Sequence, residues 1–309
     1  MSLAAARAAG DGAGPATPLA VPIPFRDPTS AFAPLAHLSW AALLDSAAEH
    51  PARGRFAYIA VDPMETLLLP AGGTANPFAL LRAKLPFGLA RALPGLPPFQ
   101  GGALGIFGYE LGHFLERLPK PRATVPAPPE MAVGLYDTVA AFDLARRKAW
   151  VIARDVPGAP LSRPPARARA EALAAKLRTA PSLGLPEWNV RGDWRAETDR
   201  TRFEAMVART VEYIRAGDIF QANMTRRFIA ALPPALDPFM LYRRLRRLSP
   251  APFAAFVNAP GLVLLSASPE RFLALDAEGR VETRPIKGTR PRGADPHLDA
   301  RFVAELRAS

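Results

Sequence analysis

Predicted β-strands follow one another along this chain instead of alternating with helices, and this order constrains the fold most. Four come in succession near the C-terminal end, at residues 253–257, 262–267, 271–275 and 281–284. The last two flank residues 276–279, DAEG, whose composition predicts a hairpin turn. Two earlier ones, 138–143 and 149–153, flank the basic residues 146–148 like the arms of another hairpin. Strands grouped in this way favour an antiparallel α+β architecture over a doubly wound parallel sheet.

Two helices are predicted between these groups of strands. Apolar residues recur at helical spacing from Phe203 to Ile214 after Asp199, and Gly217 supplies a stop. A second helix begins at the sequence Asp-Pro of residues 237–238 and continues to residue 248. Its arginines at 243, 244, 246 and 247 alternate with leucines, which predicts an amphipathic helix with a solvated basic face.

The composition excludes several classes of site. The chain of 309 residues contains no cysteine, so disulfides, thiolate metal sites and cysteine nucleophiles are excluded, as fits a cytoplasmic protein. No apolar run reaches the roughly 18 residues that a membrane span needs. The first two dozen residues are rich in Ala, Gly and Pro and lack the basic and apolar regions of a secretory signal, which predicts a flexible leader.

The formal net charge of +11 raises the question of nucleic-acid binding. The arginines are spread among alanines and prolines along the whole chain, so an arginine-rich nucleic-acid-binding module is only a distant alternative, and no nucleic-acid or membrane partner is predicted. Residues 98–110 contain several glycines without the spacing of a nucleotide-binding loop, which favours a strand with close backbone packing.

Changes in composition divide the chain into four predicted regions. They are a leader at 1–28, a first region at 29–155, a linker with a helix at 156–197 and a last region at 198–309.

Two residues near the C-terminal end could carry chemistry. Lys287 leaves a predicted strand between Ile286 and Gly288, and a lysine whose pKa is lowered by desolvation or by neighbouring cations can act as a nucleophile. Glu270 ends another predicted strand of the same hairpin, so its carboxyl could face the same pocket as a general acid. The alternatives are a surface lysine in a basic turn and an ion pair between Glu270 and Arg271.

Four motifs in order then resemble those of a known family. They are residues 217–225, GDIFQANMT; 249–253, SPAPF; 268–272, SPERF; and 282–293, ETRPIKGTRPRG. Together they resemble the chorismate-utilising enzymes, which include anthranilate synthase component I and aminodeoxychorismate synthase component I. The segments around the glycine pair at 101–102 and from residue 44 to residue 63 resemble the N-terminal part of that family. The resemblance implies an antiparallel β-sandwich with flanking helices.

The resemblance also implies roles for individual residues. Aminodeoxychorismate synthases typically carry lysine in the PIKGT motif and anthranilate synthases alanine, so Lys287 favours the former branch and leaves anthranilate synthase component I as the alternative. Lys287 would attack C2 of chorismate, Glu270 would protonate the departing C4 hydroxyl, and ammonia would then displace the lysine to give 4-amino-4-deoxychorismate for folate synthesis. Ile286, Gly288 and Thr289 would contact the substrate.

Further expectations follow from the same resemblance. A glutamine amidotransferase subunit would supply the ammonia. Mg²⁺ would be the cofactor, with ligands downstream of the PIKGT motif and none in this chain, so the chain is expected to be a C-terminally truncated, inactive fragment. The first half could hold a regulatory tryptophan site.

Overall fold

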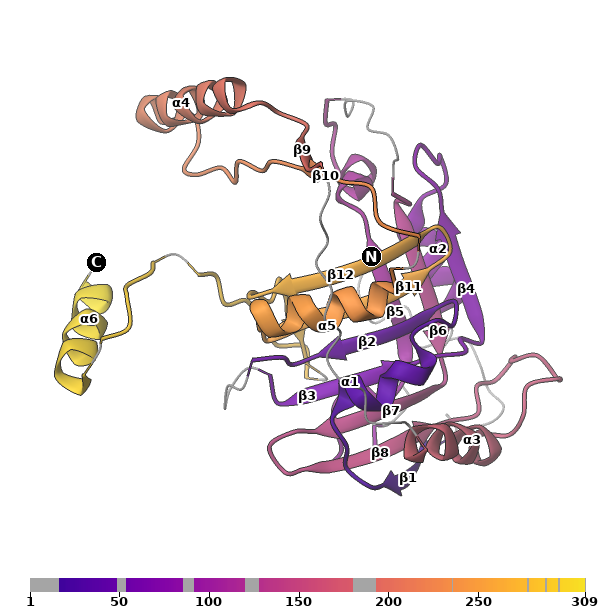
Figure 1. The fold of residues 1–309 in the computed structure, drawn as a ribbon. Helices are drawn as coiled ribbons and strands as arrows, with labels where there is room; N and C mark the ends of the chain where they lie inside the picture. The colour runs from indigo at the N-terminus through magenta and orange to yellow at the C-terminus, as the bar shows by residue number, and fades with distance from the viewer. Residues whose placement is uncertain are drawn as a thin grey trace. The chain divides into compact units, whose positions relative to one another are not determined.

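The computed structural model describes residues 17–48, 54–85, 92–119, 128–179, 193–234, 236–276, 278–286, 288–293 and 295–308 (Figure 1). The chain divides into two compact units. The first comprises residues 1–184 and 242–309, and the second comprises residues 185–241.

A seven-stranded antiparallel sheet forms the centre of the first unit. In spatial order its strands are β1 (Leu19–Ile23), β8 (Lys148–Ala153), β7 (Thr138–Asp143), β3 (Phe56–Ala60), β2 (Ala41–Asp45), β11 (Phe253–Ala259) and β12 (Leu262–Ser268). Every neighbouring pair runs antiparallel. The strands predicted at 138–143 and 149–153 are thus confirmed as a hairpin, and the antiparallel α+β architecture is confirmed with them.

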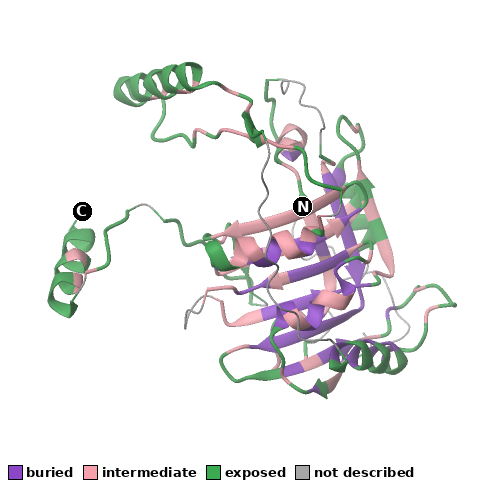
Figure 2. Ribbon diagram, viewed as in Figure 1, coloured by how far each residue is buried: buried purple, intermediate pink, exposed green. Residues whose placement is uncertain are grey.

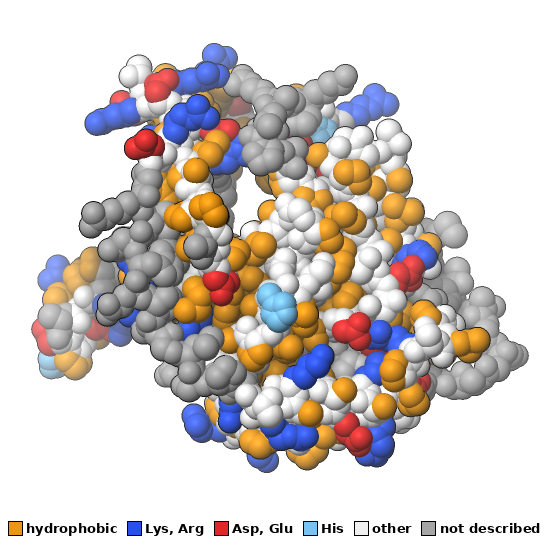
Figure 3. Space-filling model, turned by 45° about the vertical axis from the view of Figure 1, so that its right-hand side comes forward, with side chains coloured by type: hydrophobic (Ala, Val, Ile, Leu, Met, Phe, Trp, Pro, Cys, Tyr) orange, Lys and Arg blue, Asp and Glu red, His pale blue; other side chains and the backbone are white. Residues whose placement is uncertain are grey.

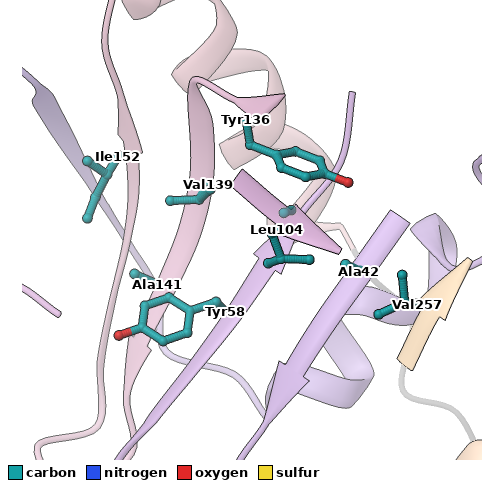
Figure 4. Close-up of a cluster of buried hydrophobic side chains, with 9 residues drawn as sticks. Ala42, Tyr58, Leu104, Tyr136, Val139, Ala141, Ile152 and Val257 are labelled. Carbon is teal, nitrogen blue, oxygen red and sulfur yellow. The ribbon is translucent and has the colours of Figure 1, made fainter. Parts of the chain in front are cut away.

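A second antiparallel sheet packs on the first. It contains β4 (Glu65–Leu69), β6 (Met131–Tyr136) and β5 (Gly102–Phe107), with β6 in the middle. Leu104 and Tyr136 from this sheet meet Tyr58, Val139 and other buried residues of the larger sheet in one apolar cluster (Figure 4). The strands of the two sheets run in clearly different directions (Figure 1). The expected β-sandwich is therefore confirmed.

Close packing inside the smaller sheet explains its glycines. A Cβ atom on Gly105 would lie 2.0 Å from the carbonyl oxygen of Ala132 on β6 and 2.6 Å from the Cα of Val133. Only a residue without a side chain allows β5 and β6 to approach so closely. The prediction of close backbone packing for residues 98–110 is confirmed.

Helices lie along the first unit at several places. They are α1 (Pro28–Phe32), η2 (Ala33–Leu35), α2 (Pro77–Lys84), η3 (Tyr109–Phe114), α3 (Ala166–Arg178) and α6 (Pro296–Ala308). Helix α3 buries Ala166, Ala170, Leu173 and Leu177, which recur every three or four residues and so share one face. Figure 2 shows the buried residues concentrated in the central strands and on this face of α3, whereas α6 buries none.

The second unit contains α4 (Arg200–Ala216) and the short paired strands β9 (Arg195–Ala196) and β10 (Phe228–Ile229). Asp199 caps α4 by accepting a hydrogen bond from the backbone N–H of Arg202, and Gly217 ends the helix with a left-handed conformation, φ 83°. Both ends of the predicted helix are confirmed. Helix α5 (Pro238–Leu248) is confirmed as well, with Asp237 accepting from the N–H of Phe239.

The structure corrects two expectations. The predicted leader at 1–28 contains β1, because residues 19–23 pair with β8 along their whole length; residues 1–16 lie outside the described residues. The basic face of α5 is only partly solvated, because Arg246 donates to the buried carboxylate of Asp45 at 2.5 Å and Arg243 is 9% exposed. The contact of Arg246 could not be predicted locally, since Asp45 is remote in sequence.

The large sheet joins two of the predicted regions. Strand β2 belongs to the region predicted at 29–155 and β11 to the region at 198–309, yet the two pair over five residue positions. The helix in the region at 156–197 is α3. The four-region division of the sequence stays a prediction.

Candidate functional site

The site predicted around Glu270 is built on a small hairpin that follows β12. Its strands are β13 (Ala274–Leu275) and β14 (Val281–Glu282), which pair antiparallel. The turn is held by Asp276, which accepts hydrogen bonds from the backbone and guanidinium of Arg280. These bonds hold the pKa of the Asp276 carboxyl below its usual value. The predicted hairpin is confirmed, although both strands are shorter than expected.

The register of this hairpin brings its two open ends together. Ala274 lies opposite Glu282 and Leu275 opposite Val281, so the same register continued outward places Glu270 opposite Ile286. The backbone N–H of Ile286 donates to Oε1 of Glu270 at 3.2 Å. Two of the predicted site residues are therefore in contact.

Glu270 is also fixed from its own side. Strand β12 ends at Ser268, whose hydroxyl donates to the carbonyl of Glu270 at 3.0 Å and accepts from its N–H at 3.3 Å. The alternative, an ion pair between Glu270 and Arg271, is not the pairing that this arginine makes. Arg271 pairs instead with Glu282 at 2.9 Å, and its guanidinium lies over the ring of Phe253.

The carboxyl of Glu270 lies beside a small pocket. Its lining consists of Phe253, Pro269, Glu270, Arg271 and Arg284. Glu270, Ile286, Gly288 and Thr289 are all exposed at the surface. Glu282 accepts from both guanidinium groups of this lining, whereas the exposed carboxyl of Glu270 can exchange a proton with a ligand.

Lys287 lies outside the described residues. It follows Ile286 directly in the sequence, so the contact of Ile286 with Glu270 concerns the residue just before it. On its other side, a Cβ atom on Gly288 would lie 2.7 Å from Cδ1 of Leu306 in α6. The roles of Lys287, Glu270, Ile286, Gly288 and Thr289 in catalysis and substrate binding stay predictions.

The residues after this motif are held against α6. Asp299 accepts from the guanidinium of Arg292 at 2.8 Å and from the N–H of Gly293 at 2.9 Å. The bond from Gly293 and the adjacent Arg292 hold the pKa of the Asp299 carboxyl below its usual value. A Cβ atom on Gly293 would lie 2.2 Å from the backbone nitrogen of Asp299, so only glycine fits this contact.

Sequence reasoning missed Glu282, which binds Arg271 and Arg284 with its two carboxylate oxygens. A signal was present, because Glu282 and Arg284 are two residues apart and such residues share one face of a strand. The described residues contain no group of three or more Asp, Glu or His side chains able to hold a metal ion. These residues do not fit a magnesium site, and the role of Mg²⁺ as cofactor stays a prediction.

A larger cavity lies elsewhere in the first unit. Its volume is about 790 Å³, and Ser46, Arg55, Arg147 and Arg246 are among its lining residues. The structure does not test whether it binds tryptophan.

Charged side chains do not merge into one basic surface on the face drawn in Figure 3. Lys and Arg side chains form several separate groups there, with Asp and Glu among them. None of the described helices is both long and apolar enough to cross a bilayer.

Curated proteins similar to this chain include aminodeoxychorismate synthases and anthranilate synthases. Aminodeoxychorismate synthase component 1 of Klebsiella aerogenes is 34% identical over 92% of this chain and 63% of its own length. Anthranilate synthase component 1 of Thermus thermophilus is 34% identical over 90% of this chain and 61% of its own, and that of Streptomyces coelicolor is 37% identical over 91% and 56%. The chain thus spans less than two thirds of the length of these relatives.

A solved structure shows the same fold. Anthranilate synthase component I of Streptococcus pneumoniae matches with a TM-score of 0.58 and 24% identity, over 74% of this chain and 53% of that one. The family model described as chorismate binding enzyme matches residues 42–309, which include the hairpin and all four motifs. The chain belongs to the family of chorismate binding enzymes.

Proposed function

We propose that this chain carries the catalytic lysine and acid of an aminodeoxychorismate synthase component I, the enzyme that converts chorismate and ammonia to 4-amino-4-deoxychorismate for folate synthesis. The observation that carries the proposal is the pairing of Glu270 with Ile286, directly before the lysine of the PIKGT motif. Relatives named aminodeoxychorismate synthase component 1 support it.

The chemistry assigns one role to each of two side chains. The neutral amine of Lys287 adds to C2 of the chorismate ring while the C4 hydroxyl leaves, and the carboxyl of Glu270 gives that hydroxyl its proton so that it departs as water. Ammonia then adds at C4 and the C2–nitrogen bond to Lys287 breaks. The enolpyruvyl group is kept, so no pyruvate forms.

The position of Glu270 supports its role as the acid, because the residue is exposed and its carboxyl contacts Ile286 of the PIKGT motif. Ile286, Gly288 and Thr289 would place the substrate ring beside the lysine.

The proposal includes a partner. Ammonia would come from a glutamine amidotransferase subunit, consistent with relatives whose names describe a first component. The protein would work in the cytoplasm, as fits a chain without cysteine.

Anthranilate synthase component I is the second candidate, because relatives with that name match over a similar share of the chain. The two functions differ in product. Anthranilate formation aminates C2 and releases pyruvate, whereas the proposed reaction aminates C4 and releases none.

The test joins residue 309 to the part of a relative that lies beyond the matched residues. One chimera takes that part from the Klebsiella aerogenes relative and a second from the Thermus thermophilus relative. Each is incubated with chorismate, ammonium and Mg²⁺, and the products are separated by liquid chromatography and mass spectrometry. The added parts alone serve as blanks.

We expect 4-amino-4-deoxychorismate from both chimeras, because the residue at position 287 lies in the part contributed by this chain. Anthranilate and pyruvate from both would reject the proposal in favour of the second candidate. No turnover by either chimera, with each parent relative active under the same conditions, would reject both functions.

A further inference from the structure

Strands β13 and β14 pair only next to the turn, which is the closed end of their hairpin. Two-stranded sheets of this size are marginal in water. Glu270 and Ile286 lie beyond the last paired residues, Ala274 and Glu282, and Pro285 has no N–H with which to extend the ladder. Side-chain contacts must therefore hold the open end in register.

Those contacts meet at Glu282. Its Oε1 accepts from Arg271 on the opposite arm at 2.9 Å, and its Oε2 accepts from Arg284 on its own arm. The guanidinium carbon of Arg271 lies 5.1 Å from the ring centroid of Phe253, the first residue of β11. Glu282 thus connects the two arms with each other and with the large sheet.

A slip of this register would separate the site residues. Moving one arm by one residue turns every side chain of that arm to the other face. In one direction Pro285 would replace Ile286 opposite Glu270, and proline has no N–H for the carboxylate to accept. The hydroxyl of Thr283, which donates to the carbonyl of Phe272 at 3.1 Å, would lose its partner as well.

We propose that Glu282 is a positioning residue, which bridges Arg271 and Arg284 so that Glu270 stays opposite Ile286, next in sequence to Lys287. Its relevance to turnover rests on the proposed function, whereas its effect on the register does not. The side chains of the three bridged residues are between 37% and 47% exposed, so the bridge adds little to global stability. Its effect is local to the open end of the hairpin.

Amide hydrogen exchange in the 309-residue chain tests the register directly. In the parent protein the Ile286 amide, which donates to Glu270, should exchange slowly, and so should the Asp276 amide, which donates to the carbonyl of Arg280 in the turn. Glu282→Gln removes the charge and one acceptor. We expect the Ile286 amide to exchange about tenfold faster in this variant while the Asp276 amide is unchanged.

Two further variants make the result specific. Glu278→Gln, in the turn of the same hairpin, removes a carboxylate that pairs with the exposed Arg280 and should leave exchange at Ile286 unchanged. Arg271→Gln combined with Glu282→Gln should exchange no faster than Glu282→Gln alone, because the two residues act as one unit. Unchanged exchange at Ile286 in Glu282→Gln would overturn the proposal. So would loss of protection at Asp276, which would show a general structural role.

The chimera assay supplies the catalytic readout. We expect Glu282→Gln to lower kcat about tenfold and to leave KM within about twofold, because a misplaced acid slows the chemical step more than it weakens binding. A raised KM with unchanged kcat would assign Glu282 to substrate binding and reject the positioning role. If the parent chimera makes no 4-amino-4-deoxychorismate, the proposed function fails, and the exchange experiment still decides the register.

Discussion

Asp137 is a single residue that joins the two sheets and binds two arginines. It lies between β6 and β7, and its side chain is 1% exposed. Arg163 donates to both of its carboxylate oxygens, at 2.6 and 2.8 Å, and Arg169 lies 3.3 Å from one of them. The hydrogen bonds that Arg163 donates to Asp137 raise the pKa of its guanidinium. The carboxylate thus compensates two charges that the fold buries.

Replacing this carboxylate should therefore be costly. We expect Asp137→Ala to lower the free energy of unfolding by about 3–5 kcal/mol, because the buried Arg169 then keeps only the exposed carboxylate of Asp155 as a charge partner. Urea denaturation would measure the change. As a control, Glu171→Ala removes the exposed partner of Arg167 on α3 and should cost about 0.5 kcal/mol or less. Equal losses in the two variants would show that the buried pair contributes nothing special.

At the scale of elements, the contact between β5 and β6 depends on one glycine. Gly105→Ala would place a methyl group against the backbone of Ala132 and Val133, which cannot move without breaking the ladder. We expect a loss of about 3 kcal/mol or more in the free energy of unfolding.

A comparison with Gly95 separates crowding from backbone conformation. Gly95 has φ 75° and open space around its Cβ position, so Gly95→Ala should cost only about 1–2 kcal/mol from the left-handed conformation. Both variants can be compared by urea denaturation. A smaller loss for Gly105→Ala than for Gly95→Ala would contradict the close approach of β5 and β6.

Local signals in the sequence predicted the elements that depend on neighbouring residues. The β7–β8 hairpin and both ends of α4 follow from turn residues, an aspartate cap and a glycine stop. The contact of Glu270 with the 286 region could be predicted for the same reason, since both ends belong to one hairpin.

Long-range contacts could not be predicted in this way. Strand β1 pairs with β8, more than a hundred residues later in the sequence. Arg246 binds Asp45, which lies about two hundred residues earlier. Proline and glycine content made residues 19–23 resemble a leader, although tertiary pairing decided their structure. The pairing of Glu282 with Arg284 had a local signal, whereas its pairing with Arg271 forms only when the two arms of the hairpin meet.

At the scale of the whole molecule, the chain carries the fold and the motifs of a chorismate binding enzyme within less than two thirds of its relatives' length. Its motifs lie in both compact units. Residues 217–225 belong to the second unit, whereas the Glu270 hairpin and the PIKGT motif belong to the first. The central claim is that the lysine of the PIKGT motif is the nucleophile.

The Lys287→Ala variant of the Klebsiella aerogenes chimera tests this claim most directly, with Lys287→Arg as a control that keeps the charge but not a nucleophilic amine. Formation of 4-amino-4-deoxychorismate should fall by roughly a thousandfold or more in both variants, because neither can form the bond to C2. Unchanged formation of 4-amino-4-deoxychorismate by Lys287→Ala would contradict the account.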